Sequence, residues 1–269
     1  VYEFPIRHAG TYWYHSHSNL QEQLGHYGPL IFDPADADPV AYDREHVIVL
    51  SDWSFMHPHT IMAKLKKAEG YFNYQRLTLA GLLGDRGREE QVPLKDRLMW
   101  QRMRMDPTDI ADVTAATYTY LVNGHGPEAP WTGLFEPAER VRLRIINAAA
   151  MTIFNLRIPG LPMTVVNADG NDVVPVDVDE LQIAVAETYD VIVQPTEERA
   201  FTLVAESTDR SGMARATLAP RLDMTADVPP LRPRPTLGMD DMGMAGHDAA
   251  AMSGGPADHA TQAGGAADH

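Results

Sequence analysis

The chain has 269 residues, of which 44% are hydrophobic, and this length and composition predict one or two globular domains with a sizeable core. Its 37 acidic and 22 basic residues give a formal net charge of −15, which would repel a phosphate backbone, so we expect no nucleic-acid partner. The chain has no cysteine, which excludes disulfides, thiol catalysis and cysteine-ligated metal sites, but it has 13 methionines and 11 histidines. No apolar run approaches the roughly 18 residues of a membrane span.

The N-terminal segment is predicted to form short strands. Tyr2 and Phe4 alternate with polar neighbours, residues 11–17 are rich in β-forming side chains, and an apolar strand stops at Pro34. Two or three strands cannot bury a hydrophobic core by themselves. We therefore expect residues 1–45 to be the C-terminal end of an incomplete domain.

A second domain is predicted over residues 46–220. It starts with an apolar strand at 46–50, and residues 57–106 then change to helical spacing, which indicates a helical insertion. Short strands return after the insertion, separated by Asn-Gly, Pro-Gly and Asp-Gly turns, and this pattern is typical of a β-sandwich. We expect these strands at 118–122, 141–147, 154–158, 164–167, 180–184, 189–194, 201–205 and 215–218.

The composition changes again from residue 221. Alanine and glycine dominate, and Leu237 is the only large aliphatic side chain after residue 231 apart from methionine. Such a segment cannot offset its ordering entropy by burial. Residues 221–269 are therefore predicted to be a flexible linker.

His15 and His17 are the strongest candidates for metal chemistry. Residues two apart on a strand face the same side, so both imidazoles could chelate one ion or straddle two ions. Neutral imidazole suits copper, zinc, iron and nickel. The alternative is a pair of half-exposed polar residues on a strand.

The sequence around these histidines resembles a known family. Residues 10–17, followed by 21–23 and 27–30, are similar to the second histidine motif of the multicopper oxidases, and most similar to the periplasmic copper-resistance oxidases of that family. The resemblance covers nearly the whole chain. It continues through residues 50–53, 103–109, 118–124, 131–135, 159–166 and 183–193.

The resemblance implies cupredoxin-like Greek-key β-sandwich domains, a copper cofactor and a periplasmic location. It implies that His15 and His17 ligate the two coppers of a type 3 pair, which joins a type 2 copper in a trinuclear cluster that reduces O₂ to water. The reducing substrate would be Cu(I) or a phenol. The family's other histidine motifs and its type 1 copper cysteine are not in this sequence. We therefore expect a truncated oxidase, inactive by itself, that comprises the end of domain 1, domain 2 and a Met/His-rich linker.

The linker is a second candidate copper site. Thioether sulfur is soft and prefers Cu(I), and a flexible chain can wrap several thioethers around one ion. The alternative is a low-complexity linker with incidental methionines. The possible ligands are Met239, Met242, Met244, His247 and Met252.

Other polar residues favour structural roles. His57 and His59 flank a proline and are expected to lie in a loop or at a helix start, whereas His26 is either a support for the histidine motif or a surface residue. Asp52, Asp169 and Asp190 adjoin turns or strand ends, where carboxylates commonly accept hydrogen bonds from the backbone.

Two further functions stay open beside the oxidase. The first is a non-catalytic copper-binding or storage module that uses the linker and a cupredoxin scaffold. The second is a purely structural β-sandwich that serves as an interaction module. A His-Cys-His motif further along the gene would distinguish the oxidase from both.

Overall fold

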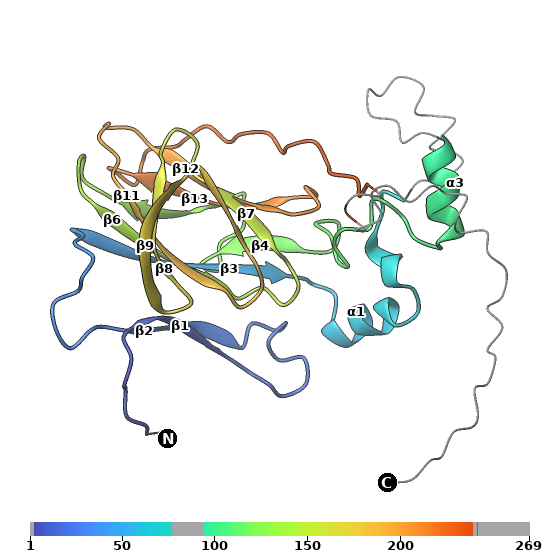
Figure 1. The fold of residues 1–269 in the computed structure, drawn as a ribbon, viewed down its shortest axis with the longest axis horizontal. Helices are drawn as coiled ribbons and strands as arrows, with labels where there is room; N and C mark the ends of the chain where they lie inside the picture. Colours follow the sequence, from blue (N-terminus) through green and yellow to red (C-terminus); the bar gives the residue numbers. More distant parts are fainter. Residues whose placement is uncertain (1–2, 77–93, 239–240, 242–269) are drawn as a thin grey trace, which may run out of the picture. The chain divides into compact units, whose positions relative to one another are not determined.

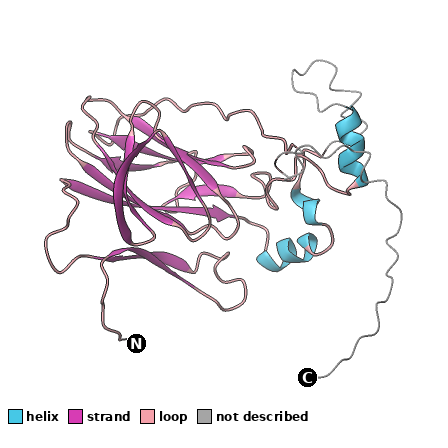
Figure 2. Cartoon of the chain, in the orientation of Figure 1, coloured by secondary structure: helices cyan, strands magenta, loops and turns pink. Residues whose placement is uncertain are grey.

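The computed structural model describes residues 3–76, 94–238 and 241 (Figure 1). The chain divides into two units, one made of Val1–Arg76 and Thr108–Thr236 and the other of Leu77–Pro107 and Leu237–His269. Strands dominate the described part of the first unit (Figure 2), so the expectation of a mainly β chain is confirmed.

Two sheets stack face to face in the first unit (Figure 1). The six-stranded sheet has the order β4-β3-β6-β11-β8-β9, and the five-stranded sheet has the order β10-β7-β12-β13-β5. The strands of the first are β3 (Arg44–Trp53), β4 (Thr119–Val122), β6 (Val141–Asn147), β8 (Met163–Ala168), β9 (Asn171–Val178) and β11 (Thr188–Val193). The strands of the second are β5 (Trp131–Leu134), β7 (Phe154–Arg157), β10 (Glu180–Ile183), β12 (Phe201–Ser207) and β13 (Met213–Ala219).

The hydrophobic core lies between these two sheets. Leu143 of β6 and Phe154 of β7 are fully buried in one continuous cluster that both sheets share. Successive side chains of a strand face opposite sides of a sheet. Arg142 and Arg144 of β6 therefore lie on the other face of the six-stranded sheet, although both are buried.

A two-stranded hairpin covers that other face. It consists of β1 (Gly10–His15) and β2 (Tyr27–Phe32), paired antiparallel. Thr11 Oγ1 donates a 2.6 Å hydrogen bond to Asp190 Oδ1 of β11, and both side chains are buried. A small apolar cluster of Val49, Ile146 and Ala148 packs with Trp13, Tyr27, Ile31 and Val47.

The helices follow β3 along the chain. In the first unit, α1 (Pro58–Leu65) is followed by the 3₁₀ turn η1 (Glu69–Phe72). The helix α3 (Leu94–Arg102) belongs to the second unit. The sequence predicts a single insertion for both helices, whereas the structure groups α3 with residues 237–269. Within the described ranges, no helix has the length and apolar character needed to cross a membrane.

All eight strands predicted after the insertion occur, with ends that differ by at most two residues. Two strands were not predicted: β5 is only four residues long and contains a glycine, and β9 is mostly exposed and contains Pro175. The predicted strand around Phe4 is wrong, because residues 3–9 form no strand and Phe4 is exposed.

The start of the predicted flexible segment also differs. Residues 221–236 belong to the first unit, and they contact the five-stranded sheet. Thr202 Oγ1 donates to the Asp227 carbonyl at 2.8 Å, and Arg232 forms ion pairs of 2.7 Å with Glu180 and Glu206. Hydrogen bonds and charge, rather than apolar burial, hold this stretch of chain.

Candidate metal centre

His15 and His17 lie together at the end of β1. The centroids of their rings are 4.6 Å apart, with an angle of 51° between the ring planes. His15 is the last residue of the strand and is partly buried, whereas His17 lies beyond the strand and is exposed. The prediction that both imidazoles project together is therefore confirmed, although the strand itself ends at His15.

The ring of His15 has a defined environment. It stacks on Trp13 at a centroid distance of 4.3 Å with an interplanar angle of 22°. Its Nδ1 atom is buried and lies 3.1 Å from Oε2 of Glu22, a close contact without the geometry of a hydrogen bond. Glu22 lies in the quoted motif, but the sequence reasoning assigned it no role, because nothing local shows that it turns back toward His15.

Several side chains hold the loop of residues 16–26. Gln21 Oε1 accepts a 2.7 Å hydrogen bond from the Ser16 hydroxyl and lies 3.3 Å from Nδ1 of His26. His26 is exposed, and its ring contacts Gln21 rather than His15 or His17 within the described contacts. Asn19 Nδ2 lies 3.1 Å from Nε2 of His59, which connects the loop to α1.

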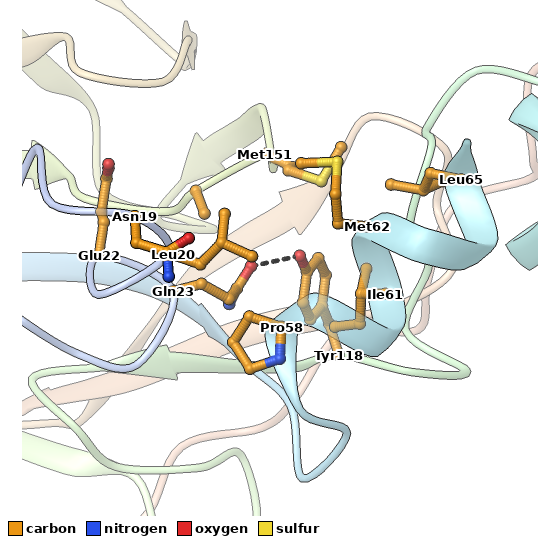
Figure 3. Close-up of a pocket in the computed structure, with 11 residues that line it drawn as sticks. Asn19, Leu20, Glu22, Gln23, Pro58, Ile61, Met62, Leu65, Tyr118 and Met151 are labelled. Atoms are coloured by element: carbon orange, nitrogen blue, oxygen red, sulfur yellow. Dashed lines mark hydrogen bonds between the residues drawn. The ribbon is translucent and has the colours of Figure 1, made fainter.

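Gln23 fixes the other side of the loop. Its amide donates a 3.0 Å hydrogen bond to the Asp52 carbonyl and accepts a 2.6 Å hydrogen bond from the Tyr118 hydroxyl (Figure 3). Burial and the nearby Asp52 carboxylate raise the pKa of Tyr118, so its hydroxyl stays protonated and donates. A pocket of about 180 Å³ lies beside these residues, and Met62 and Met151 line its far side (Figure 3).

The three aspartates have two different roles. Asp52 accepts backbone hydrogen bonds from residues 150–152, and Asp169 accepts one from Thr188, so the prediction is confirmed for both. The prediction is wrong for Asp190. Asp190 is fully buried within β11 and pairs with Arg142 at 2.6 Å and Arg144 at 3.2 Å.

Three further histidines in the described part of the chain have structural contacts. His57 is the N-cap of α1, and its Nδ1 accepts a hydrogen bond from the His59 amide, which confirms the predicted helix start. Nε2 of His46 lies 2.8 Å from the Leu134 carbonyl. His125 lies in a turn and forms an isolated bridge with Val122.

The donor set available for a metal is small in the described part of the chain. His15 and His17 supply two imidazoles, and no group of three or more His, Asp, Glu or Cys side chains is placed there to hold one ion. The predicted linker ligands Met239, Met242, Met244, His247 and Met252 lie outside the described residues. Two imidazoles can contribute to a larger site but do not fill a coordination sphere.

Curated relatives carry copper-related names. The chain is 56% identical over 255 residues to copper resistance protein A of Escherichia coli. The aligned region covers 94% of this chain and 42% of the relative. It is 54% identical over 254 residues to a copper resistance protein A homolog of Pseudomonas syringae pv. tomato. That aligned region covers 94% of this chain and 43% of the relative. The chain therefore spans less than half the length of these relatives.

Solved structures show the same fold. Fet3p, a multicopper oxidase that functions in iron import, matches with a TM-score of 0.57 and 21% identity, over 84% of this chain and 37% of that chain. A laccase from Botrytis aclada matches with a TM-score of 0.55 and 22% identity, over 85% of this chain and 38% of the laccase chain. At these identities the likeness concerns the fold alone, and it confirms the cupredoxin-like β architecture.

Two family models, both described as multicopper oxidase, match adjacent parts of the chain. One covers residues 44–221, which include both sheets of the sandwich, and the other covers residues 1–37, which include His15 and His17. Because the larger match spans more than half of the chain, the chain belongs to the multicopper oxidase family.

Proposed function

We propose that this chain is the copper-binding portion of a multicopper oxidase that acts in copper resistance. His15 and His17 would each ligate one copper of a type 3 pair. The observation that carries this proposal is the placement of two imidazoles with centroids 4.6 Å apart at the end of β1, in a chain whose family uses copper. The names of relatives at 54–56% identity support the role in copper resistance.

The residues at this site fit copper as partial ligands. Imidazole nitrogen binds copper well, and the stacking of Trp13 on His15 fixes the plane of that ring. A copper pair, when bound, supplies electrons to O₂ two at a time. In the longer protein, four electrons from Cu(I) or a phenolic substrate, with four protons, would convert one O₂ to two molecules of water. The residues of this chain would hold and orient metal, and electrons would enter elsewhere.

A non-catalytic copper-binding or storage module is the second candidate. The absence of cysteine and the methionines of residues 239–252 favour it, because a storage site needs soft ligands but no type 1 centre. The gene sequence beyond residue 269 distinguishes the two candidates. A His-Cys-His motif there supports the oxidase, and its absence supports the storage module.

Titration of the full chain with Cu(II) tests the site. We expect His15→Gln and His17→Gln each to weaken the tightest Cu(II) site by at least about 10-fold, because each removes one imidazole ligand. His8→Gln is the matched control, since His8 is exposed and lies outside the motif. Equal Cu(II) affinity in wild type, His15→Gln and His17→Gln would contradict the assignment.

The isolated chain is proposed to lack oxidase activity. Without cysteine it cannot form the copper–thiolate bond that gives an intense absorption band near about 600 nm. The copper-loaded chain should therefore show neither that band nor O₂ uptake with a phenol. Clear turnover would show that this chain holds a complete site.

The linker and the location are part of the same proposal. Met239, Met242, Met244, His247 and Met252 would bind Cu(I) as a second copper site of the protein. A periplasmic location is proposed from the bacterial copper-resistance relatives.

A further inference from the structure

The Glu22 carboxylate is placed to control which nitrogen of His15 can bind a metal. Neutral imidazole carries one proton, and the nitrogen without it is the ligand. In the structure Nδ1 of His15 is buried and lies 3.1 Å from Oε2 of Glu22. A carboxylate at this distance favours the tautomer that keeps the proton on Nδ1, because its negative charge attracts that proton and repels the lone pair that the other tautomer would place there.

The ring cannot easily rotate away from Glu22. Trp13 stacks on one face of the His15 ring at 4.3 Å, and the ring of His17 lies 4.6 Å away. Rotation of the imidazole out of this plane would break the stacking on Trp13 and move Nδ1 away from Glu22. The stacking on Trp13 therefore keeps Nδ1 of His15 beside the Glu22 carboxylate.

The loop also holds Glu22 itself. Its neighbour Gln23 is fixed by the Tyr118 hydroxyl at 2.6 Å and by the Asp52 carbonyl at 3.0 Å. Figure 3 shows the side chains of Glu22 and Gln23 pointing in different directions, with Gln23 toward Tyr118 and Glu22 away from it. The partly buried anchor at Gln23 thus fixes the backbone from which the preceding residue, Glu22, projects.

We propose that Glu22 is a positioning residue that holds His15 in the Nδ1–H tautomer and so presents Nε2 as the metal ligand. The inference rests on the proposed function for the identity of the metal, but the tautomer is a property of the metal-free chain. Carboxylate partners of ligating histidines typically raise metal affinity 10–100-fold. Glu22 would have that effect here without touching the metal.

The tautomer can be measured directly in the full chain. We would label the histidines with ¹⁵N and record the chemical shifts of Nδ1 and Nε2 in metal-free protein at about pH 8, where free imidazole is neutral. We expect His15 to be protonated at Nδ1 in wild type. Glu22→Leu should remove the preference, and Glu22→Asp should keep part of it because the charge is retained. Glu198→Gln removes the same charge from an exposed site and should change nothing.

Metal affinity provides the second measurement. We expect Glu22→Gln to weaken Cu(II) binding about 10-fold while the dispersion of the amide spectrum stays that of wild type. A wild-type His15 protonated at Nε2, or a Glu22→Leu variant with unchanged tautomer, would overturn the proposal. So would unchanged Cu(II) affinity in Glu22→Gln.

These results separate the inference from the proposed function. If His15→Gln weakens Cu(II) binding and Glu22→Gln does not, the histidine site stands and the role of Glu22 fails. If the tautomer follows Glu22 but His15→Gln leaves Cu(II) affinity unchanged, the role of Glu22 in orienting the ring stands and the copper assignment fails.

Discussion

Asp52, at the end of β3, joins three segments through its carboxylate and its backbone carbonyl. It is buried and accepts hydrogen bonds from the amides of residues 150–152 and from the Thr152 hydroxyl at 2.7 Å. Its backbone carbonyl also accepts from Gln23, which belongs to the loop after His17. A change at Asp52 should therefore affect both the sandwich and the loop.

We expect Asp52→Asn to lower the free energy of unfolding by about 3 kcal/mol. The amide replaces one acceptor oxygen by a donor that faces buried N–H groups, and unsatisfied buried donors cost about 1–3 kcal/mol each. Urea denaturation measures the change. Asp223→Asn, at a side chain that is 79% exposed, is the control and should stay within about 0.5 kcal/mol of wild type. A loss no larger than that of the control would contradict the assigned role.

Glu206 makes the stability depend on pH. Its burial would raise the pKa of the carboxyl, but hydrogen bonds from the Arg232 backbone and side chain, with the charges of Arg232 and Arg210, outweigh burial and lower the pKa. A carboxyl whose folded pKa lies below its unfolded value of about 4.3 stabilises the protein above that pH. That contribution is lost as the pH falls through the folded pKa.

Glu206→Gln should therefore lower the free energy of unfolding near neutral pH and make it less dependent on pH between about 5 and 3. We expect a loss of about 2–3 kcal/mol at pH 7, below the full value for a buried pair because its three arginine partners are partly exposed. Denaturation at a series of pH values measures both effects. Parallel pH curves for Glu206→Gln and wild type would show that another group carries the dependence, and Glu198→Gln is the exposed control.

At the scale of elements, the hairpin of β1 and β2 depends on one polar network. Thr11 Oγ1 donates to Asp190 at 2.6 Å and accepts from Arg144 at 3.1 Å, and the Thr11 carbonyl accepts from the Thr188 hydroxyl. Asp190 in turn pairs with the buried Arg142 and Arg144, which also pair with Asp38 and Glu45 respectively. The strand that ends in His15 is thus attached to the sandwich by hydrogen bonds as well as by apolar contacts.

Thr11→Val keeps the shape of this side chain and removes its hydroxyl. We expect a loss of about 1–3 kcal/mol, because Asp190 loses a buried donor. Amide hydrogen exchange should speed up in β1 more than in β12, since the hairpin packs on the outer face of the sandwich. Thr164→Val is the control, because its hydroxyl bonds to Asp177 at an exposed site. Uniform acceleration across all strands would show that the hairpin unfolds only together with the sandwich.

The strands of the sandwich could be predicted from sequence because their signals are local. Alternating apolar residues between turn residues placed β6, β7 and β12 within two residues of their observed ends. The network around Asp190 could not be predicted, because Arg142 and Arg144 alternate with apolar residues as solvent-facing side chains would. The covering hairpin and the connector that follows it, both distant in sequence, make them buried. The exposed edge strand β9 has no burial pattern from which to predict it.

At the scale of the whole molecule, the candidate site could also be predicted only in part. His15 and His17 could be found because they are two residues apart and lie in a motif with a family resemblance. Glu22, Gln23 and Tyr118 could not be assigned, because their roles depend on how a loop turns back and on a strand far along the chain. Sequence identifies the candidate ligands, whereas the residues proposed to orient them become visible only when distant segments meet.

The methionines of the C-terminal segment are proposed to form a second copper site. We expect the full chain to bind Cu(I) through Met239, Met242, Met244 and Met252, because four soft thioethers within fourteen residues can converge on one ion. Thioethers do not protonate, so this binding should persist at about pH 5, where free imidazole is largely protonated. The nearby aspartates attract cations, but salt screens that attraction beyond roughly 8–10 Å.

Competition with a Cu(I) chelator at about pH 5 and pH 7 tests this expectation. Replacement of the four linker methionines by leucine should weaken Cu(I) binding at both pH values, by at least about 10-fold at the lower one, where imidazole can no longer substitute for them. The matched control replaces Met163 and Met213, which lie in the sandwich, by leucine and should leave the linker site intact. Unchanged affinity in the linker variant would identify the methionines as incidental. Affinity that vanishes at pH 5 in the wild-type chain would instead identify histidine as the ligand.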